Sequence, residues 1–278
     1  MISDIPQSGR FQALQAYIDS LQAADWSQPG GPMQLNAKLT VNELAHIDFF
    51  ANTRIFLNAL AESDSPNATA TGNLSRVFVA QMFDRLDVAP ELRDSIRQVC
   101  KVVNEMDLWP LHIIRLVTQC AGLIIRRKNR FSLTKSGRAL LADNQAGVLY
   151  QKLFISYFRR FDLTYLFHYR HVSGIQQTIA IILWRMEIVG RDWQPVKGLA
   201  THILPAAVLD QLRQTIISPY DEEEWILSAY VLQPLLELGL IERKRTKREH
   251  FIEKSDFIRT TALWQKFTYF PAPSKPRP

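Results

Sequence analysis

The chain has 278 residues, of which 47% are hydrophobic and 10% aromatic, which is too apolar for an intrinsically disordered protein and sufficient for a sizeable core. Two cysteines, Cys100 and Cys120, are too few for a disulfide framework, and we expect both to be reduced core thiols. The first residues lack the features of a signal peptide, and no segment approaches the ~18 consecutive apolar residues that cross a bilayer. We therefore expect a cytoplasmic protein without a membrane partner.

The formal net charge of +6 is confined to two segments. Residues 126–138 hold six Lys or Arg and residues 243–248 hold five, and neither segment contains an acidic residue. The other 22 of the 33 basic residues are outnumbered by the 27 acidic residues, so the rest of the chain carries a net charge of −5. Such a distribution favours attraction of an anionic partner to two places. The alternative is that these segments are solvated turns in which Lys and Arg are simply tolerated.

The first half of the chain is predicted to be helical. Thr40 and Glu43 have the spacing of a capping box before a helix over about 41–61. Asp107 is the predicted N-cap of a later helix, with Pro110 in its first turn. Apolar periodicity and these signals predict an opening helix through Phe11 and Leu21, a linker at 27–33, and helices near 41–61, 73–86, 91–103 and 108–121.

One pattern occurs twice. Residues 116–137 and 232–254 each contain an apolar helix that ends at a glycine, then a Leu-Ile strand, a basic run and a second strand. Gly122 and Gly239 occupy the position after a helix end, where a positive φ is easily adopted by glycine. The predicted return strands are 131–134 and 257–260.

The second half begins with an aromatic segment. Residues 145–190 predict two helices and a loop that belong to the core rather than to a ligand site. Further helices are predicted near 175–188 and 203–217, followed by one that starts at Ser218 and Pro219, with four acids at 221–224. Pro234 is expected to kink that helix.

These features resemble the winged-helix superfamily, in two copies. The resemblance implies a helical domain that closes with a β hairpin, called the wing. A narrower resemblance, to uncharacterised bacterial proteins associated with plasmid-borne open reading frames, rests on residues 69–82 (TATGNLSRVFVAQM), 122–143 and 239–245. That family implies no activity. Leu263-Trp264 stands where Gly137 follows the first wing, so the sequence leaves open how similar the two exits from the wings are.

The predicted fold class is mainly α with short antiparallel β hairpins, as tandem winged-helix-like domains joined by a helical middle. The predicted organisation is an N-terminal helix and linker (1–33), a first domain (34–144), an aromatic helical connector (145–174), a second domain (175–270) and a Pro-rich tail (271–278).

Two parts of this fold bear on nucleic-acid binding. His112, Arg115 and Gln119 share one stripe of the 108–121 helix and are able to contact base edges, but the same stripe is equally typical of the solvated side of an amphipathic helix. The basic runs are suited to phosphate contacts, which carry no sequence information. The predicted binding residues are Arg115, Gln119, Arg126, Arg127, Lys128, Arg130, Lys135, Arg243, Lys244, Arg245, Lys247 and Arg248.

The second copy also supports a different function. Four acids at 221–224 would repel phosphates, and the helix that follows is apolar on nearly every side. Such a helix packs inside its domain or in a subunit interface, and a homodimer through 218–238 or through the aromatic connector is consistent with it.

No constellation of residues indicates an enzyme, a cofactor or a metal site. His168 and His171 form an H-x-x-H pair, but no further ligands complete a zinc set, so we interpret them as histidines at the edge of the core. The expected function is a non-enzymatic nucleic-acid-binding protein, most readily of duplex DNA and with a regulatory role. The alternative is a protein-interaction or scaffolding module whose winged helices do not contact nucleic acid.

Overall fold

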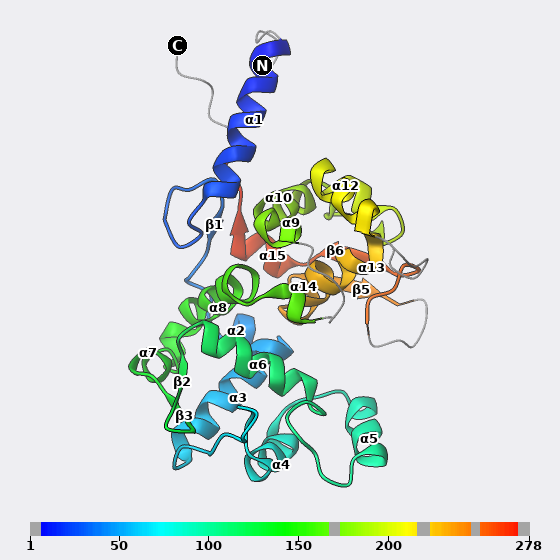
Figure 1. Ribbon diagram of the computed structural model, residues 1–278. Helices are drawn as coiled ribbons and strands as arrows, with labels where there is room; N and C mark the ends of the chain where they lie inside the picture. The colour runs from blue at the N-terminus through cyan, green and yellow to red at the C-terminus, as the bar shows by residue number, and fades with distance from the viewer. Residues whose placement is uncertain (1–6, 167–172, 216–222, 246–250, 272–278) are drawn as a thin grey trace. The chain divides into compact units, whose positions relative to one another are not determined.

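The computed structural model describes residues 7–166, 173–215, 223–245 and 251–271. It is mainly helical with short antiparallel strand pairs, which confirms the prediction of a mainly α chain with short β hairpins (Figure 1). The chain divides into two units. Unit 1 combines residues 1–36 with 162–278, and unit 2 is residues 37–161.

Unit 2 is built around one buried helix. Its helices are α2 (Val41–Leu44), α3 (Asp48–Glu62), α4 (Arg76–Arg85), α5 (Pro90–Val99), α6 (Trp109–Cys120), α7 (Lys135–Ala139) and α8 (Ala146–Ile155), and α8 continues as a π-helical segment, Ser156–Arg160. Strands β2 (Ile124–Arg127) and β3 (Arg130–Leu133) form its hairpin. Helix α6 packs on α3 and on the π-helical segment, and its side chains Leu111, Ile113, Ile114 and Val117 are almost fully buried.

The predicted capping box is confirmed. The Thr40 side chain accepts a hydrogen bond from the Glu43 amide, and the Glu43 carboxylate accepts one from the Thr40 amide. The helix that starts there is shorter than predicted, because the chain turns after α2 and α3 begins anew at Asp48. Leu44 and Ile47, on either side of this turn, are both buried in the core.

Unit 1 contains both ends of the described chain. Its elements are α1 (Gln7–Ala23), β1 (Gln34–Leu35), a 3₁₀ turn (Leu163–Leu166), α9 (Ser173–Gln177), α10 (Ile179–Val189), β4 (Gln194–Pro195), α11 (Leu199–Ile203), α12 (Ala206–Thr215), α13 (Glu223–Leu227), a π-helical segment (Ser228–Leu232), α14 (Gln233–Glu237), β5 (Ile241–Lys244), β6 (Phe257–Thr260), α15 (Ala262–Phe267) and β7 (Thr268–Tyr269). Helix α1 packs on α10, where the rings of Tyr17 and Trp184 meet edge to face at 5.5 Å between centroids. β1 pairs with β7, so residues 34–35 are joined to the C-terminal part of the unit.

The long helix predicted in the second copy is irregular. Its start at Ser218 lies outside the described residues, and α13, the π-helical segment and α14 follow one another from Glu223 to Glu237. The proline ring at 234 cannot donate the backbone hydrogen bond of a regular helix. The preceding turn is π-helical, with the Gln233 amide bonded to the carbonyl of Ser228. The irregularity expected at Pro234 therefore takes this form. Most side chains between Glu223 and Glu237 are buried, as the all-round apolar pattern predicted.

Both glycines of the repeated pattern end their helices in the same way. Gly122 has φ 66° and Gly239 has φ 68°, in the left-handed region that glycine tolerates. In each copy the amide of the next residue, Leu123 or Leu240, donates to the carbonyl five residues earlier at 2.9 Å. This is the hydrogen bond of a Schellman motif, and it directs the chain from the helix into the first hairpin strand.

The exits from the two hairpins are also alike. Thr134 caps α7 through the amide of Gly137 at 3.0 Å, and Thr261 caps α15 through the amide of Trp264 at 3.3 Å. A Cβ at Gly137 would lie 2.1 Å from the carbonyl oxygen of Leu123, whereas Trp264 fits its position fully buried. The difference in sequence at the two exits therefore changes the side chains but not the capping of the backbone.

Candidate nucleic-acid interface

The β2–β3 hairpin closes with a two-residue turn. Lys128 (φ 49°) and Asn129 (φ 58°) both have positive φ, as a type I′ turn requires. This turn matches the natural twist of paired strands, and it sets Arg127 opposite Arg130. The basic run therefore folds into a tight turn and not into an open loop.

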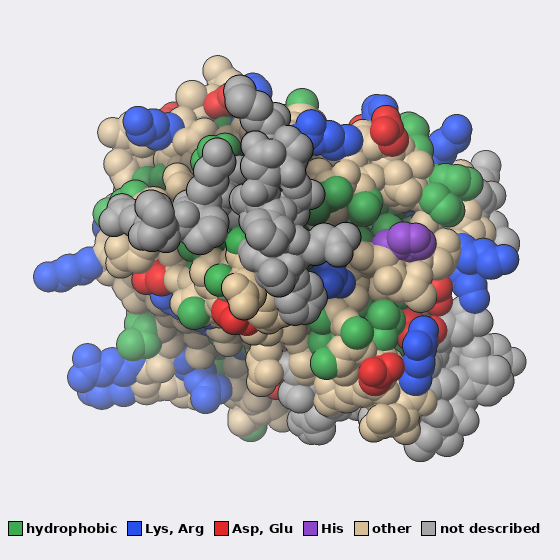
Figure 2. Space-filling model, turned by 90° about the horizontal axis from the view of Figure 1, so that it is seen from above, with side chains coloured by type: hydrophobic (Ala, Val, Ile, Leu, Met, Phe, Trp, Pro, Cys, Tyr) green, Lys and Arg blue, Asp and Glu red, His purple; other side chains and the backbone are tan. Residues whose placement is uncertain are grey.

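The hairpin carries exposed positive charge. The side chains of Arg126, Arg127, Lys128 and Arg130 are exposed, and none forms an ion pair with any residue that the structure describes. Lys135, in the first turn of α7, is also exposed. Other exposed arginines, such as Arg191 and Arg213, are bonded to carboxylates. On the face shown in Figure 2, Lys and Arg side chains are interspersed with acidic and hydrophobic ones.

The hairpin is fastened to the segment before α4. The Asn129 side chain donates to the carbonyl of Ala68 at 3.0 Å, and the Ala68 amide donates to the carbonyl of Asn129 at 2.8 Å. The amide of Phe131 donates to the carbonyl of Pro66 at 2.9 Å. An extended segment at 66–68 thus lies along β3, on the side away from β2, and Asn67 is bridged to Arg130. These bonds hold the turn in one place.

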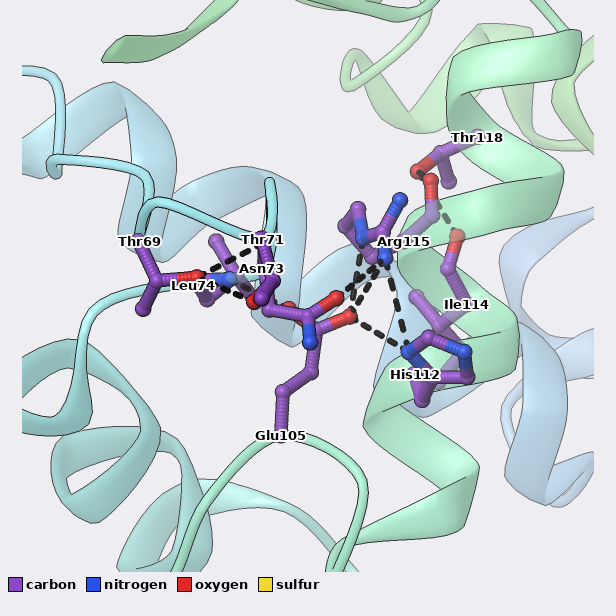
Figure 3. Close-up of polar contacts among 9 residues, drawn as sticks. All are labelled: Thr69, Thr71, Asn73, Leu74, Glu105, His112, Ile114, Arg115 and Thr118. Atoms are coloured by element: carbon purple, nitrogen blue, oxygen red, sulfur yellow. Dashed lines mark hydrogen bonds and ion pairs between the residues drawn. The ribbon is translucent and has the colours of Figure 1, made fainter. Parts of the chain in front are cut away.

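A buried ionic cluster lies beneath this region (Figure 3). Glu105 is almost fully buried; one of its carboxylate oxygens bonds His112 Nδ1 at 2.6 Å and Arg115 Nε at 2.8 Å. Its other oxygen accepts from the amide of Leu74, and Arg115 donates to Asn73 at 3.3 Å. The cluster joins α6 to the 69–74 loop in front of α4.

The cluster lowers the pKa of Glu105. Burial alone would raise the pKa of this carboxyl, but four influences outweigh it: the hydrogen bond with His112, the positive charge of Arg115, the hydrogen bond from the amide of Leu74 and the hydrogen bond from Arg115. Glu105 is therefore held as a carboxylate inside the unit.

The predicted base-reading stripe on α6 is corrected by this geometry. His112 is 1% exposed and Arg115 6%, so both side chains point into the unit; of the three, Gln119 alone is exposed. Arg115 is buried because Glu105 neutralises it. Glu105 was not among the residues predicted from sequence, although it lies only seven residues before His112 in the chain. The predicted N-cap is wrong as well: α6 follows Leu108, and the Asp107 carboxylate instead accepts from the amide of Asn104.

The second basic segment is only partly available. Arg243 is a β5 residue whose side chain is 3% exposed and lies 3.2 Å from the carboxylate of Asp256. Burial lowers the pKa of Arg243, and the charge of Asp256 partly offsets this effect. Lys244 and Arg245 are exposed, whereas Lys247 and Arg248 lie outside the described residues. Arg243 thus holds the hairpin to Asp256 and is not free to contact phosphate.

The acids expected to repel DNA have internal partners where they are described. Glu224 accepts from the amide of Gly198 at 2.9 Å, and Glu223 bonds Arg213 at 2.9 Å. Asp221 and Glu222 lie outside the described residues, as do His168 and His171. Within the described ranges, no three His, Cys, Asp or Glu side chains are grouped so as to hold a metal ion. In that part of the chain, no helix is both long and apolar enough to cross a membrane.

The match to a known family lies in unit 2. The model of the Y4jL N-terminal domain family matches residues 45–146. The chain resembles an uncharacterised bacterial family. The uncharacterized protein y4jL of Sinorhizobium fredii is 29% identical over 111 residues, which is 40% of this chain and 46% of that protein. The chain thus spans less than half the length of this relative. No solved structure matches the chain.

Proposed function

We propose that this chain is a non-enzymatic nucleic-acid-binding protein that contacts the phosphates of duplex DNA through the β2–β3 hairpin of unit 2. The observation that carries the proposal is the set of four exposed cations at this turn, none of them paired with a described carboxylate. Cations held against the backbone release condensed counterions from DNA, which supplies affinity without sequence information.

The proposal includes a winged-helix architecture for both units. In unit 2 the extended segment 66–68 lies beside β3, which pairs with β2. In unit 1, β4 lies beside β6, which pairs with β5. In each unit a helix precedes the extended segment, and the helix before the hairpin ends at a glycine. This shared order supports the proposal, as does the resemblance of the sequence to that superfamily.

The contact we propose is with phosphates and not with base edges. In DNA-binding winged helices, the helix before the hairpin enters the major groove. Helix α6 occupies that place in the chain, but it is buried along most of its length, and Arg115 is committed to Glu105. We therefore leave Arg115 and Arg243 out of the proposed surface. Arg126, Arg127, Lys128, Arg130 and Lys135 remain, with Lys244 and Arg245 as a second group.

A salt titration tests this function. Fluorescence anisotropy of a labelled duplex should show affinity that falls steeply with salt, with a slope of about −0.9 per phosphate contacted. Replacing Arg126, Arg127, Lys128 and Arg130 by Gln should flatten that slope. The matched control replaces Arg85, Arg191, Arg213 and Arg259 by Gln; it removes the same charge from arginines that have carboxylate partners. Equal slopes for both quadruple variants would contradict the assignment to the hairpin.

A protein-interaction module is the second candidate. The observation that favours it is the burial of α6 and of the helix before β5, which leaves neither for a DNA groove. Val77 and Val99 are at the same time 83% and 81% exposed. No binding of duplex, single-stranded DNA or RNA at low salt would favour this candidate. Light scattering would then show whether the partner is a second copy of the chain.

A further inference from the structure

Arg127 and Arg130 are direct partners across the hairpin. Residues that face each other in an antiparallel pair lie on one side of the ribbon, with Cβ atoms about 4.5–5.5 Å apart. Ile125 and Ser132 form the next pair on this same side, and Ile125 is 48% exposed. The opposite side carries Phe131, which is fully buried. The two arginines thus project from the solvent-facing side of the ribbon.

This pairing is unfavourable in the free protein. Like charges directly opposite each other destabilise an antiparallel pair. Neither guanidinium has a carboxylate partner among the residues that the structure describes. Repulsion of this kind is relieved when one anion lies between the two cations.

The backbone around the pair is prepared for such an anion. The turn between the two arginines is held in place by the hydrogen bonds between Asn129 and Ala68. The strand after it is held by the hydrogen bond from the amide of Phe131 to the carbonyl of Pro66. An anion bound by Arg127 and Arg130 would therefore not have to order the chain that carries them, which reduces the entropic cost of binding.

We infer that Arg127 and Arg130 together hold a single phosphate group of the nucleic-acid backbone. Guanidinium groups present forked N–H donors that match phosphate oxygens, and two of them neutralise more charge than one phosphodiester carries. The exposed Ile125 on the same side offers an apolar surface to the adjoining sugar. Arg126 belongs to the other side of the ribbon, where its guanidinium lies against Gly72, and it does not share this phosphate. This inference rests on the proposed function, because it names how the same hairpin contacts its partner.

The salt slope counts phosphates, so it separates a shared contact from two independent ones. The double variant Arg127→Gln/Arg130→Gln should lower the slope by about 0.9, the value for one phosphate. A loss near 1.8 would mean that each arginine contacts its own phosphate, and an unchanged slope would mean that neither does; both results overturn the inference. The matched control, Lys128→Gln/Lys135→Gln, removes the same charge from residues that are not cross-strand partners, and its slope should fall by up to about 1.8.

Thermal denaturation with inorganic pyrophosphate tests the pair without nucleic acid. At constant ionic strength, pyrophosphate should raise the Tm of the wild type and of Arg191→Gln/Arg213→Gln, which removes the same charge outside the hairpin, and leave the Tm of the double arginine variant unchanged. Without the anion, the double arginine variant should melt at or above the wild-type temperature, because the repulsion is gone.

The two measurements distinguish the failure of either idea. A wild type that binds no duplex but gains stability from pyrophosphate through this pair would refute the proposed function and leave the anion site standing. A wild type that binds duplex, with no response to pyrophosphate and a slope loss near 1.8, would refute the shared phosphate alone.

Discussion

The guanidinium of Arg126 lies directly against Gly72. A methyl group at residue 72 would lie 2.1 Å from Nη1 of Arg126, and Gly72 has a φ of 84°. A residue of the β2–β3 hairpin is therefore packed on a bend of the loop that precedes α4, a loop that the Glu105 cluster also holds. Glycine is favoured here for two reasons: it tolerates the positive φ, and it leaves room for the guanidinium of Arg126.

Gly72→Ala should destabilise the protein by about 1–2 kcal/mol, because alanine is strained at positive φ and meets Arg126. The control is Gly122→Ala, since Gly122 has φ 66° but no atom within 4 Å of an added Cβ, so it reports the backbone strain alone. Urea denaturation of both variants, and of Gly72→Ala/Arg126→Ala, completes the comparison. If Arg126 contributes to the cost, the double variant should recover the difference between the two glycine variants.

Gly137→Ala should cost more than Gly122→Ala, by about 2–3 kcal/mol, because the added Cβ meets a backbone carbonyl that cannot rotate away. That carbonyl belongs to Leu123, the residue just before the first strand of the hairpin. Urea denaturation measures the cost. Equal stabilities of the two alanine variants would show that the backbone at Leu123 yields easily.

Glu105→Gln should destabilise unit 2 by about 3–5 kcal/mol, because it leaves the charge of Arg115 buried without a counterion. The control is Glu62→Gln, which breaks the exposed ion pair with Arg85 and should cost less than about 1 kcal/mol. Chemical denaturation of the two variants compares them. A small effect at Glu105 would mean that water or a neighbouring group compensates Arg115 when Glu105 is neutral.

The lowered pKa of Glu105 predicts a dependence of stability on pH. In the unfolded chain this carboxyl titrates near its ordinary value of about 4.3, and in the folded protein it titrates lower. The folded state therefore binds fewer protons between these two values, and the contribution of Glu105 is complete above about pH 4.3 and is lost as the pH falls through the folded value. Denaturation from pH 7 to pH 3 should show wild-type stability falling more steeply than that of Glu105→Gln. Parallel curves would assign the acid sensitivity to other groups.

Local sequence determined a large part of this fold. The capping box at Thr40 and Glu43 was predicted, as were the helix-ending glycines and return strand 257–260, because each depends on residues only a few positions apart. The exposure of the basic residues between 126 and 130 also follows from sequence, because the side chains that flank a tight turn have little room to be buried.

Only the tertiary structure decided which charges are available. Arg115 has the spacing of a solvated helix face, but Glu105, ten residues away across a loop, neutralises it inside the unit. Arg243 belongs to a basic run, yet its side chain is buried in an ion pair with Asp256, the residue before the second strand of the hairpin. Charge is written in the sequence, whereas burial depends on the partner that folding brings within hydrogen-bonding distance. The cross-strand pairing of Arg127 and Arg130 was likewise decided by the tertiary structure. It depends on the two-residue turn at Lys128 and Asn129, whose positive φ sets the register of the strands.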